Sequence, residues 1–244
     1  MNEQSNNRII DETAKQLIAS AKVLVVGAGS LGCPALQYLV AMGVGTIGVV
    51  DFGFVVNEGL SAKVLFSPAD KDFKKTMIVT KRLQRQNLDI KIVPHDLQVT
   101  AANVSELISD YDIIIDCTND INTSNVLNDA AVFAGKPVIY AFTNGVEGII
   151  AIWNIKNEDG TFSPNYRDLF AKDSEFTNEQ DHSAGGMHTL AGIIGCIQAN
   201  EVIKLITNTG HLLKGKAMIF NALSLQSRVI DLGHSTTFIN SFLR

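Results

Sequence analysis

The sequence has no closely spaced pair of cysteines. Its three cysteines, Cys33, Cys117 and Cys196, lie far apart, each among apolar residues, and no CxxC motif occurs. Cysteines in such surroundings are usually small buried thiols. A disulfide framework is therefore not expected, nor is a structural zinc site, which needs about four sulfur or nitrogen ligands close together.

Signals for secretion, membrane insertion and nucleic-acid binding are also missing. The first residues, MNEQSNNRII, are polar and lack the apolar core of a signal peptide. The most apolar stretch, residues 189–206, includes Gln198, Glu201 and Lys204, which indicates an amphipathic or buried helix rather than a membrane span. The net charge of −5 argues against phosphate backbones as ligands. We therefore expect a cytoplasmic protein without a membrane or nucleic-acid partner.

Apolar strands and amphipathic helices alternate along most of the chain, and 46% of the residues are hydrophobic. This spacing predicts one doubly wound α/β domain over residues 1–244, with a mostly parallel sheet and a Rossmann-like nucleotide-binding half. Strands are expected at 22–27, 46–51, 89–96, 111–118, 136–145, 147–154 and 216–222, the last ending the fold. Helices are expected at 8–20, 30–41, 74–86, 101–110, 121–135 and 187–207.

A glycine motif joins the first strand to the next helix. Gly27, Gly29 and Gly32 form GxGxxG. Glycine allows the tight turn there and lets backbone N–H groups approach phosphate at the positive end of the helix. Asp51 ends the second strand, where a carboxylate can accept hydrogen bonds from ribose hydroxyls. The alternative is a packing turn beside an ordinary acid, and the motif alone does not choose between NAD and ATP.

Residues further along the chain favour ATP. Asn57 lies in a loop, Lys75 begins a helix, and the stretch DCTND, residues 116–120, follows a buried strand. The carboxyl ends of parallel strands meet at one edge of a sheet, so these groups should gather there. A lysine and carboxylates suit a metal-bound polyphosphate better than a nicotinamide ring. An NAD-dependent oxidoreductase remains the less favoured alternative.

Four segments together carry a family resemblance: residues 23–52, the lysine pair at 74–75, YDIIIDCTND and AGIIGCIQANEVIKLI. They are similar to the ubiquitin-activating-enzyme superfamily, in particular its ThiF, MoeB and HesA type, over about residues 8–230. The resemblance implies that ATP and Mg²⁺ are bound. It also implies that the C-terminal glycine of a small ubiquitin-like sulfur carrier or peptide is adenylated. A dimer is implied as well, either with a second copy or with a relative.

The resemblance assigns most of the site residues. The loop glycines and Asp51 match the nucleotide-binding positions, and Lys75 matches a lysine that contacts phosphates. Cys117 and Thr118 match the nucleotide-binding stretch that follows the buried strand. Arg8 lies where the family has an arginine that reaches the partner's active site, although it could equally be an exposed tail residue.

Other positions depart from the family pattern. Gly59 and Ala62 stand where the family has an asparagine and an arginine, and the family's Asp-Asn pair is inverted to Asn119-Asp120. Losing such charge-stabilising groups can silence catalysis while nucleotide binding persists. Asn57 is a candidate replacement for the asparagine, Lys63 for the arginine, and Asp120 for the catalytic and magnesium-binding carboxylate. The alternative is a catalytically weakened partner subunit or scaffold.

The family's zinc-binding CxxC pairs are absent, and its reactive cysteine is replaced by the DHS stretch at 181–183. His182 and His188 are either a metal or base pair or, as we favour, an ordinary loop and helix-start pair. Lys81, Arg82 and Arg85 are expected on a solvated helix face.

The polar segment near 155–186 is too long for an ordinary connector. In the family it crosses over the carrier's tail, so we expect much of it to be mobile until a tail binds. The alternative is a loop pinned as one short helix by its apolar residues, which are Phe162, Tyr166, Leu169 and Phe170.

Overall fold

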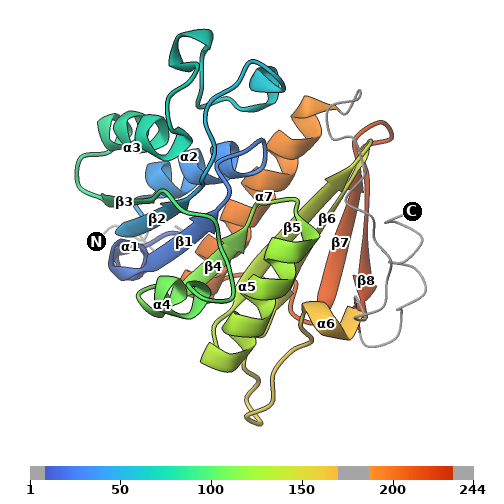
Figure 1. The fold of residues 1–244 in the computed structure, drawn as a ribbon. Coiled ribbons are helices and arrows are strands. Elements are labelled where there is room, and N and C mark those ends of the chain that lie inside the picture. Colours follow the sequence, from blue (N-terminus) through green and yellow to red (C-terminus); the bar gives the residue numbers. More distant parts are fainter. Residues whose placement is uncertain (1–8, 170–186, 233–244) are drawn as a thin grey trace, which may run out of the picture.

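The computed structural model describes residues 9–169 and 187–232, which form one eight-stranded sheet with helices on both faces (Figure 1). The strands are β1 (Lys22–Val26), β2 (Thr46–Val50), β3 (Lys91–His95), β4 (Ile113–Asp116), β5 (Val138–Asn144), β6 (Glu147–Trp153), β7 (Lys216–Asn221) and β8 (Gln226–Asp231). The α-helices are α1 (Glu12–Ser20), α2 (Gly32–Met42), α3 (Lys75–Gln86), α4 (Val104–Ser109), α5 (Ile121–Ala134), α6 (Tyr166–Leu169) and α7 (His188–Thr207). Two short 3₁₀ helices, η2 (Leu60–Ala62) and η3 (Pro68–Asp70), lie between β2 and α3.

The sheet has the order β3-β2-β1-β4-β5-β6-β7-β8. Its first five strands are parallel, and β6, β7 and β8 continue it in antiparallel fashion. The expected doubly wound α/β fold with a Rossmann-like half is confirmed. The expected end of the fold is wrong, because β8 follows β7 across a hairpin. Five of its six side chains are exposed, so its sequence has none of the apolar alternation that marks a half-buried strand.

Both faces of the parallel half are covered, which explains the continuous apolar runs of its strands. On β1, Val23 and Val25 face a core that includes residues of α1, α2, α3 and α7. Leu24 and Val26 face the opposite core, which includes residues of α4 and α5. The two faces therefore bury alternate side chains of the same strand.

The longest helix, α7, lies against α2 and the sheet (Figure 1). Within the described residues it alone is long and apolar enough to cross a bilayer, and half of its most apolar window is buried inside the protein. A side-chain carbon at Gly195 would collide with the backbone oxygen of Leu31. Gln198 and Glu201 are also buried. The apolar length of α7 is thus used to pack the core.

The loop between β2 and α3 is held by a side chain expected on a solvated face. Arg82 forms an ion pair with Asp70 (2.6 Å) and donates to the hydroxyl of Ser67 and the carbonyl oxygen of Leu65. The prediction for Arg82 is therefore wrong. The periodicity of α3 places Arg82 on its polar face, but it does not reveal that η3 folds back against that face.

The first part of the long polar segment is packed. Tyr166 opens α6, is buried, and lies edge-on to Tyr140 and Trp153. Its backbone N–H donates to Asn128 Oδ1 at 2.8 Å. Residues 170–186 lie outside the described residues, and so does Arg8. The expected mobility of the segment stays a prediction.

Candidate functional site

The candidate site lies at the carboxyl ends of the parallel strands. In the strand order, β2 and β3 lie on one side of β1. The next strand in the chain, β4, lies on the other side of β1. In open α/β sheets, ligands bind at such a switch point. The loops after β1 and β4 lie in contact there, since a side-chain carbon at Gly27 would stand only 2.7 Å from the backbone oxygen of Cys117.

The three glycines of the motif contribute to the loop in different ways. Gly27 has a φ of +98°, which favours glycine, and Gly32 has no room for a side chain because the carbonyl oxygen of Gly27 fills that space. A side-chain carbon on Gly29 would meet nothing within 4 Å. Gly27 and Gly32 therefore shape the turn, whereas Gly29 keeps its outer side open. This open turn leads into α2, as a phosphate cradle requires.

Asp51, just after β2, holds the site together. Its Oδ2 accepts from the backbone N–H of Ala28 (2.9 Å), and its Oδ1 accepts from that of Gly53 (2.8 Å). The ammonium of Lys75 lies 3.2 Å from Oδ2 and 3.3 Å from Oδ1. Gly53 packs closely here, since a side-chain carbon at this position would lie 3.1 Å from Asp51 Oδ1 and 3.2 Å from Lys75 Nζ. The structure thus brings the glycine loop, Asp51 and Lys75 together.

Lys63 shares the electrostatic environment of this group. Burial and the nearby charge of Lys75 lower the pKa of Lys63, while Asp51 opposes the shift. Burial raises the pKa of the Cys33 thiol to about 12, so Cys33 stays protonated. The Lys63 ammonium donates to the carbonyl oxygen of Glu58 at 3.1 Å.

Asn57 is exposed at the start of the turn that leads into η2, and its carbonyl oxygen accepts from Leu60 N–H at 3.2 Å. Ala62 lines a mostly apolar groove of about 590 Å³ that Ser30 of the glycine loop also lines. On the wall of the same groove, His188 opens α7 with its Nδ1 3.0 Å from Ser61 Oγ. His188 is thus a helix-start histidine, and His182 lies outside the described residues.

The stretch after β4 is tied down by buried polar groups. Asp116 accepts from the hydroxyls of Thr118 and Ser124, and burial raises the pKa of its carboxyl. The Cys117 thiol points into the core, where it lies 3.3 Å from Gln198 Oε1. The thiol is therefore engaged in the core, while the backbone oxygen of Cys117 lies against Gly27. The side chain of Thr118 is committed to Asp116.

Asn119 and Asp120 have defined structural tasks. Asn119 has a φ of +55°, and its amide exchanges hydrogen bonds with the backbone of Thr143 on β5 (3.0 and 3.4 Å). Asp120 is the N-cap of α5, where its Oδ2 accepts from Thr123 N–H and from the Thr123 hydroxyl. Among the described residues, no group of three or more His, Cys, Asp or Glu side chains could hold a metal ion. A nucleotide-bound magnesium needs only one or two carboxylates beside phosphate and water, and Asp120 offers one such carboxylate.

Two residues that organise the site were missed by sequence reasoning. Gln198 of α7 donates to the carbonyl oxygen of Asp116 (2.8 Å) and so fixes the end of β4. The sequence feature that could have revealed Gln198 is its place as a polar residue inside an apolar helix. Gly53 gave no signal, because the turn after Asp51 matches no motif.

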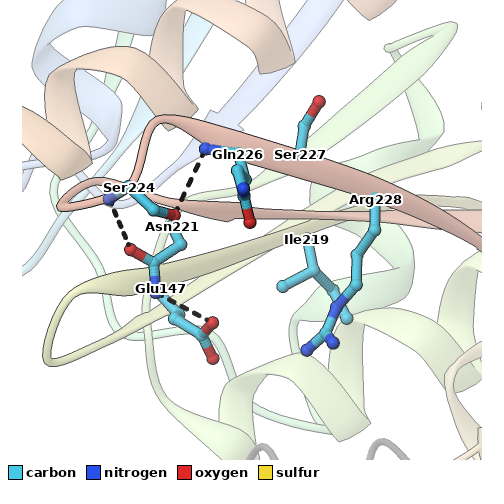
Figure 2. A pocket seen from close by; sticks show the side chains of 7 residues that line it. All are labelled: Glu147, Ile219, Asn221, Ser224, Gln226, Ser227 and Arg228. Atoms are coloured by element: carbon cyan, nitrogen blue, oxygen red, sulfur yellow. Dashed lines mark hydrogen bonds between the residues drawn. The ribbon is translucent and has the colours of Figure 1, made fainter.

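A second, polar pocket of about 280 Å³ lies at the same edge of the sheet, where β6 and β8 begin and β7 ends (Figure 2). Asn221 Nδ2 donates to Glu147 Oε1 at 3.1 Å, and the hairpin residues Gln226 and Arg228 line the pocket beside them. Glu147 pairs with Asn144, the last residue of β5. Asn119, which bonds the backbone of Thr143, therefore lies at the same edge of the sheet as this pocket.

The fold matches solved structures of known proteins. E. coli MccB crystallised with ATP superposes with a TM-score of 0.79 at 20% identity, covering 92% of this chain and 67% of that chain. PaaA superposes with a TM-score of 0.75 at 20% identity, covering 90% of this chain and 66% of that chain. At this level of identity, the two superpositions show a shared fold.

Sequence relatives carry the family assignment. A sulfur carrier protein adenylyltransferase of Thermus thermophilus is 33% identical over 215 residues, which are 88% of this chain and 79% of the relative. The adenylyltransferase and sulfurtransferase MOCS3 of Sus scrofa is 34% identical over 88% of this chain, which spans only 46% of that relative. The family model "ThiF family" matches residues 1–237. The chain therefore belongs to the ThiF family.

Proposed function

We propose that the protein is an ATP-dependent adenylyltransferase that activates the C-terminal carboxylate of a small carrier protein or peptide. The observation that carries this proposal is the assembly of Asp51, Lys75 and the open glycine loop at the switch point of a ThiF-family sheet. The names of the Thermus and Sus relatives support it.

In this proposal ATP binds along the loop after β1. The Asp51 carboxylate accepts from the ribose hydroxyls, and backbone N–H groups at the start of α2 receive phosphate. The ammonium of Lys75 stands beside Asp51, so a positive charge is already in place near the loop. Magnesium bound with ATP would neutralise phosphate charge, and Asp120 is the carboxylate that this chain offers to it.

The reaction needs little from the protein beyond position and charge. The carrier's carboxylate is ionised at neutral pH, so no general base is required. One of its oxygens attacks the α-phosphorus, the bond to the leaving pyrophosphate breaks, and an acyl adenylate forms. Lys75 and Lys63 stabilise the charge that moves onto pyrophosphate, while the sheet edge orients the two substrates.

The carrier's tail would approach along the polar edge that ends in the pocket of Figure 2. An extended peptide can follow this edge, because β5 and β7 end there and β6 begins there, which places their terminal backbone and side-chain groups side by side. We also propose that the protein works as a dimer, with itself or with a relative. Sedimentation at micromolar concentration checks this, and monomers alone, both with and without relatives, would contradict it.

A second candidate is a catalytically weakened subunit that binds nucleotide or carrier without turnover. Ala62, Gly59 and Asn119 favour it, since they replace an arginine, an asparagine and a carboxylate of the family pattern. Carrier-dependent exchange of labelled pyrophosphate into ATP separates the two candidates.

The exchange assay needs a carrier ending in Gly-Gly and, as control, the same carrier with an amidated C-terminus. Exchange with the first carrier only supports the adenylyltransferase. ATP binding without exchange supports the weakened subunit. Binding of NAD in place of ATP would overturn both.

A further inference from the structure

Ser61 and His188 meet on the wall of the mostly apolar groove beside the glycine loop. Ser61 Oγ lies 3.0 Å from His188 Nδ1, although the two residues are 127 positions apart in the chain. Both residues are exposed and both line the groove, so a molecule in the groove can reach them. A hydroxyl bonded to an imidazole is the arrangement in which histidine activates serine as a nucleophile.

The groove begins at the glycine loop. Ser30, which directly follows Gly29, lines it together with Pro34 of α2. The opposite walls come from α7 and from Ala62 and Val64, which lie at the end of η2 and just after it, and they are mostly apolar. The proposed nucleotide site places phosphate at this loop, so an acyl adenylate would form next to the groove.

The N-terminus of α7 lies beside the pair, because His188 is the first residue of this helix. The first N–H groups of an α-helix have no partner within the helix, and this end carries a partial positive charge. The N-cap residue, Met187, makes no side-chain hydrogen bond to them. An oxyanion formed by attack of Ser61 would therefore meet a positive helix end, which stabilises it.

We infer that Ser61 is an acyl acceptor, which takes the carrier's C-terminal acyl group from the adenylate as an ester. The inference rests on the proposed function. His188, with its own proton on Nε2, accepts the hydroxyl proton at Nδ1 as Ser61 Oγ attacks the acyl carbon. A bond forms between Oγ and that carbon, the bond from the carbon to the phosphate oxygen breaks, and AMP leaves with the electron pair. The mostly apolar walls disfavour water, which would otherwise hydrolyse the ester.

The test looks for the ester while adenylation proceeds. The protein is mixed with ATP, magnesium and a small carrier ending in Gly-Gly, quenched in acid within seconds, and analysed by mass spectrometry. We expect an adduct with the summed mass of the two proteins less a water, formed only when ATP is present. Hydroxylamine should cleave this adduct and dithiothreitol should not, because dithiothreitol cleaves thioesters but leaves esters intact.

Variants separate acyl transfer from adenylation. Ser61→Ala should abolish the adduct and keep carrier-dependent pyrophosphate exchange, because adenylation does not use this hydroxyl. Ser61→Cys should give an adduct that dithiothreitol cleaves. His188→Gln should slow adduct formation about 100-fold, as for a lost general base. Thr189→Val is the matched control, since it removes another hydroxyl from the groove wall and should change neither adduct nor exchange.

Exchange without an adduct would overturn the inference and leave adenylation standing. An adduct that persists in Ser61→Ala, or that forms at the wild-type rate in His188→Gln, would overturn it too. A wild-type adduct that dithiothreitol cleaves would point instead to a thiol, and Cys196 lines the same groove. Absence of both exchange and adduct would end the proposed function together with this inference. Thermal melting of each variant shows that a lost adduct is not a lost fold.

Discussion

Asp51→Ala tests whether one carboxylate organises the site. The Asp51 side chain is only 9% exposed and receives two backbone N–H groups and the Lys75 ammonium. Hydrogen bonds to a charged group contribute about 1.5–3 kcal/mol each, so the two backbone bonds set an upper bound of about 6 kcal/mol. Water can enter at this open edge, and Lys75 can turn to solvent, so we expect a loss of about 2–4 kcal/mol. A domain stability of roughly 5–15 kcal/mol leaves the variant folded.

ATP binding should suffer more than the fold. The variant loses the proposed ribose acceptor and releases Ala28 of the glycine loop, so we expect ATP affinity to fall about 100-fold, equivalent to about 3 kcal/mol. Calorimetric titration at a temperature well below the melting transition measures this.

The matched control is Asp129→Ala, which removes a carboxylate from an exposed pair with Arg167 on α6, away from the sheet edge. Exposed pairs contribute up to about 1 kcal/mol, and ATP affinity should not change. If folded Asp51→Ala protein binds ATP with wild-type affinity, Asp51 does not hold the nucleotide and the site is misassigned.

Three further predictions address the loop, the sheet edge and the polar segment. Gly32→Ala should disrupt the loop and lower the melting temperature, because its new methyl group meets the Gly27 carbonyl, whereas Gly29→Ala should melt like wild type yet bind ATP more weakly. Burial lowers the pKa of His95, whose Nε2 lies 2.7 Å from Tyr111 Oη. As pH falls below about 6.5, His95 therefore binds a proton in the unfolded chain before it does so in the folded protein. The free energy of unfolding should decline there by up to about 1.4 kcal/mol per pH unit. In denaturant titrations, His95→Gln should remove that decline. Hydrogen exchange should be fast across 172–186 without ligand and slow when a carrier binds; slow exchange in the free protein would contradict this.

The sequence was enough to predict the first seven strands and the glycine loop, because local patterns encode them. Strands β1, β2 and β4 are buried on both faces, so each is a short unbroken apolar run that ends at a glycine or an acid. Gly135 closes α5 in the left-handed conformation, which glycine adopts readily, so the end of the predicted helix at 121–135 is also encoded locally. The meeting of Asp51 with the glycine loop followed from the parallel order of the strands.

Contacts between distant segments could not be read in this way. Gln198 reaches Asp116 across 82 positions, and Arg82 reaches Asp70 only because η3 folds back. In each case the tertiary arrangement chooses among several partners that the local pattern allows.

Asp120, in the inverted pair after β4, has one structural role and one proposed role in metal binding. Asp120 caps α5 in the free protein, and it is also the carboxylate nearest in sequence to the family's metal position. Asparagine caps helices about as well as aspartate, so Asp120→Asn should change stability by no more than about 0.5 kcal/mol. It also removes the charge that magnesium would use.

We therefore expect ATP affinity in Asp120→Asn to fall about 10-fold with magnesium present and to stay unchanged without it, because each carboxylate interaction with a bound cation is comparable to a charged hydrogen bond. Asp11→Asn is the control, since Asp11 caps α1 through the same kind of bond, from Ala14 N–H at 2.8 Å. Identical magnesium dependence in wild type and Asp120→Asn would make Asp120 a cap and nothing more. The inversion to Asn119-Asp120 would then have removed the metal carboxylate from this site.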